Sequence, residues 1–363
     1  SSHFGSSYRA LSGRHGACGL NACLGHVRLA LHGLIFFLLC AYVAYSGARK
    51  QCGRSLGLDA NTSSWTKSLW NEVLWAETTA GTRRAPPGGT RIAIAVPYRD
   101  QRPLQDRRAH LVKFAEHMKR FLELLTSSPE LNCEAALLLV VEQSRDGRRF
   151  NRGQLLNVGF RIAQRSLPGM TSFITHDVDL LPSHDLLRAY ALPPPFGFAV
   201  HLAARWQKYG HAGFMGGVLA LRPEEYMCVN GFPNDIWGWG CEDSQLGKRM
   251  DVWNIQRLPV EAGTYEDLDA RNFLKLTYEY ERWFNPDFLK FSCYALPPSW
   301  RRENGVRGIP DAVAMALVRA RIWASVRNSS APGGVTFEFT NVDAVRMRHV
   351  VVDLLPFESV YSK

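Results

Sequence analysis

An alternation of apolar runs with helical segments constrains the fold of this chain more than any other feature. Residues 92–96 and 135–141 are continuous apolar runs, as expected of strands buried on both faces, and residues 172–175 begin a third. Between them lie a helical stripe that opens at Pro103 and a second helical segment that Asn151 can cap. This order predicts an α/β fold with a mainly parallel sheet flanked by helices.

The third apolar run ends in an acidic motif, Asp177-Val178-Asp179. Ligands of such sheets bind beyond the carboxyl ends of the strands. In an extended chain, residues two apart face the same way, so both carboxylates can point into one cleft while Val178 faces the core. Two hard oxygen donors suit Mg²⁺ or Mn²⁺ that bridges to a diphosphate. The alternative is an ordinary turn or cap.

A second motif, Trp-Gly-Trp-Gly-Cys-Glu-Asp, occupies residues 237–243. Indole faces stack on the apolar faces of sugar rings, and glycines let the backbone approach a ligand or move as a lid. Glu242 and Asp243 supply a candidate base and a partner for hydroxyl groups. The alternative is a pair of core tryptophans in a glycine-rich turn, which leaves both carboxylates without a role.

Two arginines and a glycine pair complete the candidate ligand-binding residues. Arg99 closes the first apolar run, where it can meet phosphate oxygens. Arg152 follows Phe150 and Asn151 at a helix start, where the helix dipole also favours an anion and the Phe150 ring can stack on a base. Taken singly, each arginine is more simply explained as a surface residue. Gly216-Gly217 precedes an apolar strand and indicates either close approach to a ligand or a bulge.

The N-terminal region contains a candidate membrane anchor. Residues 29–45 are almost wholly apolar and approach the length of a spanning helix. A cleaved signal peptide is the alternative, and the flanking positive charges balance, so charge does not set the orientation. The predicted organisation is a tail at residues 1–28, a transmembrane signal-anchor at 29–46, a stem at 47–90 and one large domain at 91–363, with an insertion at about 290–330.

Charge and cysteine content exclude some classes of protein. The formal net charge is +10, but the basic residues are scattered and form no nucleic-acid-binding signature, which predicts no nucleic acid partner. The cysteines after the predicted anchor show no zinc-binding spacing, and their odd number cannot all pair within one chain. Sequons at Asn61 and Asn328 permit N-glycosylation if the long C-terminal part is lumenal.

The ordered motifs resemble those of the beta-1,4-galactosyltransferases. The resemblance covers roughly residues 90–270, with a weaker similarity at 335–354. Its most specific part is the Trp-Gly-Trp-Gly run followed by Glu-Asp. The residues around Asp177 and the run Cys228-x-Asn230-Gly231 are most similar to the xylosylprotein branch, which adds the first galactose of the glycosaminoglycan linker. The motifs are residues 96–99, 150–152, 156–160, 177–182, 216–217, 230–232, 237–240 and 242–243.

The resemblance implies a GT-A fold and a single-pass type II protein of the Golgi membrane, with residues 1–28 cytoplasmic and the catalytic domain lumenal. It implies an inverting transfer of galactose from UDP-galactose to the 4-hydroxyl of an acceptor sugar on a glycan or glycopeptide, with xylose as a candidate acceptor. Asp243 would be the general base, Glu242 would bind acceptor hydroxyls, and Trp239 would lie between donor and acceptor on a mobile loop.

The resemblance also implies three sets of site residues. The donor nucleotide-sugar site would comprise Pro97, Tyr98, Arg99, Phe150, Asn151, Arg152, Asp177, Val178, Asp179, Phe214, Gly217 and Trp239. The acceptor site would comprise Trp237, Cys241, Glu242, Asp243 and Ser244. Mn²⁺, or Mg²⁺ in its place, would be held by Asp179, Asp267 and Asp269.

The sequence departs from the family pattern at several of these positions. Asp267 and Asp269 stand where the family has histidines, which can shift the metal preference toward harder ions. Gln101 stands where a second arginine is usual, Phe214 replaces a tyrosine, and Ser244 replaces an acidic residue. Two alternatives therefore stay open: a transferase on the same scaffold that uses UDP-N-acetylgalactosamine or an N-acetylglucosaminide acceptor, and an inactive lectin-like Golgi protein.

Overall fold

The computed structural model describes residues 88–100, 106–206, 208, 214–270, 304–310 and 344–354. The predicted anchor, both sequons, nearly all of the stem and most of the predicted insertion lie outside the described residues. Among the helices that are described, none combines the length and the apolar character needed to cross a membrane.

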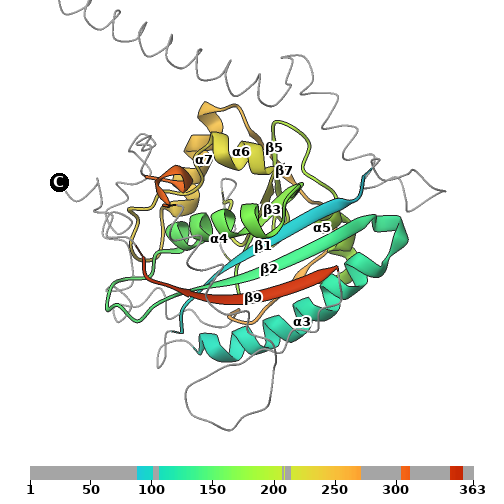
Figure 1. Ribbon diagram of the computed structural model, residues 1–363, viewed down its shortest axis with the longest axis horizontal. Coiled ribbons are helices and arrows are strands. Elements are labelled where there is room, and N and C mark those ends of the chain that lie inside the picture. Colours follow the sequence, from blue (N-terminus) through green and yellow to red (C-terminus); the bar gives the residue numbers. More distant parts are fainter. Residues whose placement is uncertain are drawn as a thin grey trace, which may run out of the picture. The chain divides into compact units, whose positions relative to one another are not determined.

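A seven-stranded sheet forms the centre of the described part, in the order β7-β5-β6-β3-β1-β2-β9 (Figure 1). Its strands are β1 (Thr90–Tyr98), β2 (Cys133–Gln143), β3 (Ser172–His176), β5 (Phe198–His201), β6 (Val218–Leu221), β7 (Gln256–Pro259) and β9 (Val345–Val352). Only β6 runs antiparallel to its neighbours, β3 and β5; the other neighbouring pairs are parallel. The predicted α/β fold with a mainly parallel sheet is confirmed.

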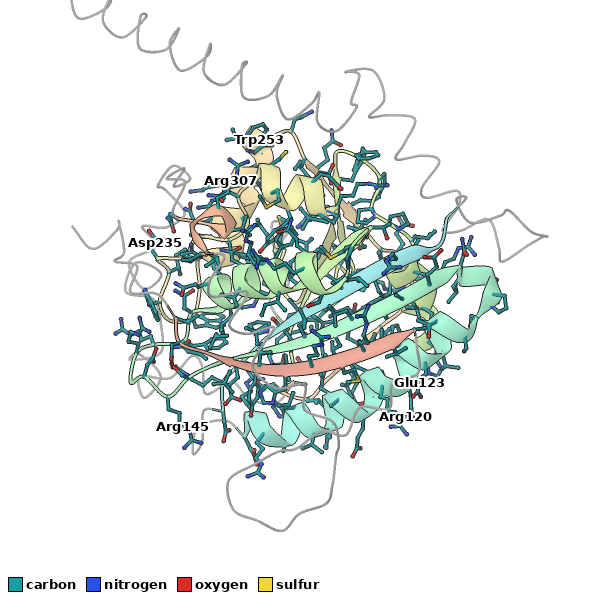
Figure 2. All side chains as sticks on the ribbon, in the orientation of Figure 1. Arg120, Glu123, Arg145, Asp235, Trp253 and Arg307 are labelled. Carbon is teal, nitrogen blue, oxygen red and sulfur yellow. The ribbon has the colours of Figure 1, made fainter. Side chains whose placement is uncertain are left out.

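Helices cover both faces of the sheet, with α3 (Arg107–Ser127) and α4 (Arg152–Ser166) on opposite sides (Figure 1). The outward side of α3 carries Arg120, which extends away from the sheet (Figure 2). The remaining described elements are η1 (Pro129–Leu131), β4 (Leu180–Pro182), η2 (His184–Leu186), α5 (Leu187–Ala191), α6 (Pro223–Cys228), α7 (Glu242–Val252), β8 (Tyr265–Asp267) and η5 (Val306–Gly308).

The two faces of the sheet differ in the size of their side chains, because neighbouring residues of a strand point to opposite faces. In β1, Ile92 and Ile94 join the hydrophobic cluster that includes α3, whereas Ala93 and Ala95 join the cluster that includes α4. A Cβ on Gly159 of α4 would lie 2.8 Å from the Cβ of Ala95. Small residues on both elements therefore let α4 pack closely against the centre of the sheet.

The first helix begins later than the sequence predicted. It starts at Arg107 rather than at Pro103, because Asp106 is its N-cap and accepts a hydrogen bond from the backbone N–H of Ala109. The predicted cap at Asn151 is confirmed, since its side chain accepts from the N–H of Gln154. Near the C-terminus, β9 extends the sheet beside β2. Residues 304–310, part of the predicted insertion, place Val306 and Ile309 in the core cluster on the α4 side.

Candidate active site

Arg152 joins acidic residues from two distant parts of the chain. Its guanidinium lies 2.9 Å from a carboxylate oxygen of Asp177, which follows β3, and 2.9 Å from one of Asp243, in the first turn of α7. The neighbouring Glu242 lies 3.8 Å away. We call these four residues the Arg152 cluster. The acidic motif after the third strand and the acidic pair after the tryptophans thus meet at one buried cation.

The start of α4 holds Arg152 in place. Asn151, its N-cap, is completely buried. The Asn151 N–H donates to the side chain of Gln143 at the end of β2, 2.9 Å away, and its amide donates to the carbonyl of Asn234 at 2.7 Å. Asn151 was predicted to bind the donor, and its side-chain amide and oxygen are engaged in fixing the helix start and the loop before Trp237.

The Trp-Gly-Trp-Gly run turns sharply into α7. Gly238, Gly240 and Cys241 all have positive φ angles, of 97°, 102° and 81°. Glycine enters this region without strain, whereas a residue with a side chain, such as Cys241, rarely does. The N–H of Gly238 donates to the carbonyl of Phe150, 2.8 Å away, so the run is tied to the approach to α4. Both tryptophans remain partly exposed, which differs from a pair enclosed in the core and leaves indole surface that a sugar can contact.

The charge of the Arg152 cluster is unbalanced within the described residues, because three carboxyl groups surround one guanidinium. Burial raises the pKa of Glu242 to about 8, and the neighbouring Asp243 adds to the rise while Arg152 opposes it. Burial also raises the pKa of Asp177. The cluster can therefore retain a proton on Glu242 near neutral pH.

The glycine pair before β6 brings backbone close to this cluster. A Cβ on Gly216 would lie 2.6 Å from a carboxylate oxygen of Asp243 and 2.6 Å from the ring of Phe214. The carbonyl of Gly217 accepts a hydrogen bond from the N–H of Asp177, 3.0 Å away. The backbone of the glycine pair therefore lies directly beside two residues of the Arg152 cluster.

A second acidic group lies where β4 pairs with β8. Arg107, the first residue of α3, contacts Asp179 at 2.6 Å and Asp269 at 3.4 Å. Lys208 contacts Asp267 at 3.2 Å and Asp269 at 3.7 Å. We call these five residues the Arg107–Lys208 cluster. The antiparallel register, with Leu180 opposite Asp267, explains why the residue before β4 meets the residues that end and follow β8.

The motif Asp177-Val178-Asp179 is not the extended chain that the sequence argument assumed, and its two carboxylates pair with different arginines. The motif forms a turn, in which the N–H of Leu180 donates to the carbonyl of Asp177 at 3.4 Å, because the chain must leave β3 and enter β4 within four residues. Asp177 consequently contacts Arg152, whereas Asp179 contacts Arg107. Val178 is buried as predicted, with 6% of its surface exposed.

The predicted metal ligands Asp179, Asp267 and Asp269 converge, and their chemistry fits a hard divalent cation such as Mn²⁺ or Mg²⁺. In the structure, these carboxylates form ion pairs with Arg107 and Lys208. Across the part of the chain that the structure describes, no three His, Cys, Asp or Glu side chains are disposed to hold a metal ion. The chemistry of the three carboxylates suits the ion, but with Arg107 and Lys208 paired to them their present arrangement does not form a metal site.

Other predicted donor residues have structural contacts. Arg99 donates to the carbonyl of Arg148 at 2.7 Å, and its guanidinium lies 5.6 Å from the centre of the Phe150 ring. Tyr98 is buried and lies edge-on to His349 of β9. Pro97 pairs with Val141 inside the sheet.

Three predicted acceptor residues cluster around the start of α7. The Trp237 ring faces the guanidinium of Arg148 at 4.6 Å. Cys241 is buried and disulfide-bonded, Cys228 is partly exposed and also disulfide-bonded, and Cys133 is free. Ser244 is partly exposed within the first turn of the helix.

Sequence reasoning missed a chain of buried polar groups behind the acidic turn. His176 Nε2 lies 2.8 Å from the Tyr190 hydroxyl, which lies 2.9 Å from that of Tyr265. Burial lowers the pKa of His176 to about 4, so the imidazole is neutral at pH 7. The chain links the end of β3 to β8, and no spacing in the sequence pointed to it.

Arg107 was missed as well, although a signal existed. It follows Asp106 as Arg152 follows Asn151, so both central arginines occupy the first position after a capping Asp or Asn.

Comparison with known proteins agrees with these motifs. Residues 80–191 match the model described as the N-terminal region of glycosyl transferase group 7, and residues 198–270 match the one described as the N-terminal domain of galactosyltransferase. The two matches follow one another in the order of the motifs. The chain belongs to glycosyltransferase group 7. The resemblance to this family that the sequence indicated is thereby confirmed.

Relatives of this glycosyltransferase include human beta-1,4-galactosyltransferase 4, which is 32% identical over 218 residues, 57% of this chain and 59% of the relative. Human beta-1,4-galactosyltransferase 3 is 35% identical over 204 residues, 52% of this chain and 47% of the relative. The chain thus spans about half the length of the curated relatives it matches. A solved structure of the catalytic domain of Drosophila beta1,4-galactosyltransferase 7 with xylobiose is 27% identical and covers 60% of this chain and 83% of its own, with a TM-score of 0.45.

Proposed function

We propose that this group 7 glycosyltransferase transfers galactose from UDP-galactose to the 4-hydroxyl of an acceptor sugar, on a GT-A-type scaffold. The observation that carries the proposal is that Arg152 joins Asp177, beside the expected nucleotide position, to Asp243, the expected base. Donor and acceptor chemistry need adjacent groups, because the reacting atoms of the two sugars must approach to about 3–3.5 Å. The names of the relatives support the choice of donor and linkage.

Asp243 takes the proton of the acceptor hydroxyl in this mechanism. A sugar hydroxyl is a weak nucleophile at neutral pH, so removal of its proton in the transition state contributes strongly to the rate. The deprotonated oxygen then attacks the anomeric carbon of galactose from the side opposite UDP, which inverts that centre. Arg152 and the close backbone of Gly216 hold the Asp243 carboxylate in one orientation.

The aromatic and acidic neighbours of Asp243 position the sugars. Trp237 and Trp239 offer partly exposed indole faces for stacking on sugar rings. Glu242, which retains a proton near neutral pH, can donate to an acceptor hydroxyl as well as accept from one. Arg99 and Phe150 lie at the ends of β1 and of the segment before α4, where they would meet the nucleotide.

A divalent ion would be held by Asp179, Asp267 and Asp269, with Mn²⁺ expected and Mg²⁺ as the alternative. When bound, such an ion neutralises the charge that develops on the departing nucleoside diphosphate.

The acceptor that the sequence favours is xylose, because residues 176–182 and the run Cys228-x-Asn230-Gly231 are most similar to the xylosylprotein branch. The location that we propose is the Golgi membrane in type II orientation, which the family resemblance implies and for which the apolar stretch at 29–45 would supply the anchor. Removal of N-linked glycans from the cellular protein by a glycosidase, with a shift in its mass, would support a lumenal domain, and an unchanged mass at both sequons would count against it.

A donor and acceptor screen tests the function. The purified protein is incubated with UDP-galactose or UDP-N-acetylgalactosamine, with xyloside or N-acetylglucosaminide acceptors, and with or without Mn²⁺. We expect transfer from UDP-galactose to the xyloside when Mn²⁺ is present. Transfer only from UDP-N-acetylgalactosamine would replace the donor, and no transfer in any combination together with retained sugar binding would establish the lectin-like alternative.

A further inference from the structure

The carboxylates expected to hold the divalent ion are already paired with protein cations. Arg107 and Lys208 are both largely enclosed, with 13% and 9% of their side chains exposed. Their four contacts to the three carboxylates range from 2.6 to 3.7 Å. This pairing concerns the metal site of the proposed function and rests on that function, but it assigns roles to two residues that the family comparison does not mark.

Asp267 shows why these cations and a metal ion compete. One of its carboxylate oxygens accepts from the indole N–H of Trp206 at 3.0 Å and lies 3.2 Å from the ammonium nitrogen of Lys208. The other accepts from the N–H of Asp269 at 2.8 Å and from Lys208 at 3.5 Å. Both oxygens therefore have two donors, and an ion can bind either one only if Lys208 moves.

Asp269 and Asp179 are restricted in a similar way. The same Asp269 oxygen faces Arg107 at 3.4 Å and Lys208 at 3.7 Å, so two positive charges converge on one atom. One of the two shortest contacts of the cluster, 2.6 Å, joins Arg107 to Asp179. A divalent cation at coordination distance from these oxygens would lie within a few ångströms of both protein cations, where like charges repel strongly because water is largely excluded.

The two helix caps differ in burial. Asp106, the cap of α3, is exposed, whereas the cap beside Arg152 is buried and bonded to two other elements. Lys208 has a long side chain with rotatable bonds that can carry its charge away from the carboxylates. Arg107 also lies 3.2 Å from His110 Nδ1, and Lys208 donates to the backbone carbonyl of Asp269 at 2.6 Å, so displacement would break these contacts as well.

We propose that Arg107 and Lys208 are exchangeable counter-ions of the metal site. They neutralise and preform the three carboxylates, and a divalent cation displaces them when it binds. The two residues thereby set the affinity for the ion: they keep the acidic cluster stable and lower its attraction for any divalent cation. They are positioning residues in this scheme, because they act on the carboxylates and not on the sugars.

Direct metal binding tests the proposal without any sugar or nucleotide. Mn²⁺ is titrated into the full chain, and free Mn²⁺ is measured by electron paramagnetic resonance, for the wild type, Arg107→Met, Lys208→Met and the double variant. We expect the double variant to bind Mn²⁺ about 10-fold or more tightly than the wild type, the size of effect that groups around metal ligands commonly have. The charge-preserving Arg107→Lys should bind like the wild type.

Two controls identify the site and the specificity of the effect. Arg120→Met removes an arginine from the exposed outer side of the same helix and should leave Mn²⁺ affinity unchanged (Figure 2). Asp179→Asn should abolish the tight binding of the double variant. Equal affinity of the wild type and the double variant, including no binding by either, would overturn the proposal, as would weaker binding by the variants.

A second measurement needs no variant and so survives any failure of a variant to fold. Displaced Lys208 becomes accessible, so its amine should react faster with an acylating reagent in saturating Mn²⁺, as measured by mass spectrometry, while exposed Lys119 should not change. Unchanged or slower labelling of Lys208 would contradict displacement. Because neither measurement involves transfer, an inactive protein with the expected Mn²⁺ behaviour would refute the proposed function alone.

Discussion

The Arg152 cluster and the Arg107–Lys208 cluster share one local feature, an arginine at the start of a helix, and differ in the burial of the residue that caps that helix. In each, an arginine occupies the first position of a helix, directly after a capping Asn or Asp. The Asn151 cap is completely buried and bonded to Gln143 and to the loop before the tryptophans, whereas the Asp106 cap is exposed. The same start of a helix therefore places its guanidinium beside a buried cap in one cluster and beside an exposed cap in the other.

The clusters also differ in charge. Within the described residues, the Arg152 cluster sets one cation against three carboxyl groups, and the Arg107–Lys208 cluster sets two cations against three. In the first, burial and then the neighbouring Asp243 raise the pKa of Glu242, as suits a site that handles protons. The second is nearly neutralised by groups that an external cation can replace. The candidate proton-transfer site and the candidate metal site thus consist of similar residues. They differ in how far protein cations neutralise the three carboxyl groups.

The largest expected effect is on the turnover number, and it should arise from the Arg152 cluster alone. Asp243→Asn should lower the turnover number about 100-fold to 10,000-fold, because an amide cannot accept the acceptor proton, while Mn²⁺ binding stays unchanged. Steady-state transfer assays and Mn²⁺ titration measure the two quantities. Asp251→Asn, an exposed position on the same helix, is the control. If turnover is unchanged in Asp243→Asn, Asp243 is not the general base.

Loss of the central cation should test the difference in anchoring. Arg152→Met leaves Asp177, Glu242 and Asp243 together in a buried place without their counter-charge, which should lower the free energy of unfolding by about 3–5 kcal/mol. Urea denaturation measures the change. Arg165→Met, near the partly exposed end of the same helix, should have little effect. If Arg107→Met destabilises the protein more than Arg152→Met, our ranking of the two clusters is wrong.

A segment distant in the sequence, which contains Asn304, holds the loop that leads to the Arg152 cluster. Its hydrogen bonds to that loop can be removed by a single substitution. The Asn304 side chain accepts from the N–H groups of Asn234 and Asp235, at 2.7 and 3.2 Å, in the loop that leads to the tryptophans. Asn304→Ala removes the acceptor of both N–H groups and should cost about 1–3 kcal/mol of stability. Arg307→Ala, an exposed neighbour (Figure 2), should cost less than about 0.5 kcal/mol. Equal losses would mean that the segment stabilises by packing alone.

The last prediction concerns the proton on Glu242 and the change in stability per pH unit. Because the folded protein raises its pKa from 4.5 to about 8, this group stabilises the fold fully below about pH 4.5, and that contribution is lost as the pH rises toward 8. Glu242→Gln should therefore flatten the fall in unfolding free energy over this range, by at most about 1.4 kcal/mol per pH unit. Denaturation at several pH values measures the slope, with exposed Glu224→Gln as control. A slope that Glu242→Gln leaves unaltered would argue against the unbalanced charge.

Much of the scaffold was predictable because it depends on local pattern. Continuous apolar runs predicted β1, β2 and β3, and the capping side chain of Asn151 located the start of α4. These features are properties of a few consecutive residues, so the sequence determined them by itself. The same holds for the family, since the Trp-Gly-Trp-Gly run followed by Glu-Asp is short and specific and the motifs occur in a fixed order.

Only the tertiary structure decided which charges meet. Arg107 and Asp269 are separated by 162 positions, and Arg152 and Asp243 by 91, and no periodicity links such distant residues. The directions of Asp177 and Asp179 depended on the turn into β4, whose pairing with β8 is itself a long-range contact. Helices and strands follow from neighbouring residues, whereas the balance of buried charge follows from how those elements pack, and that balance is what distinguishes the two clusters.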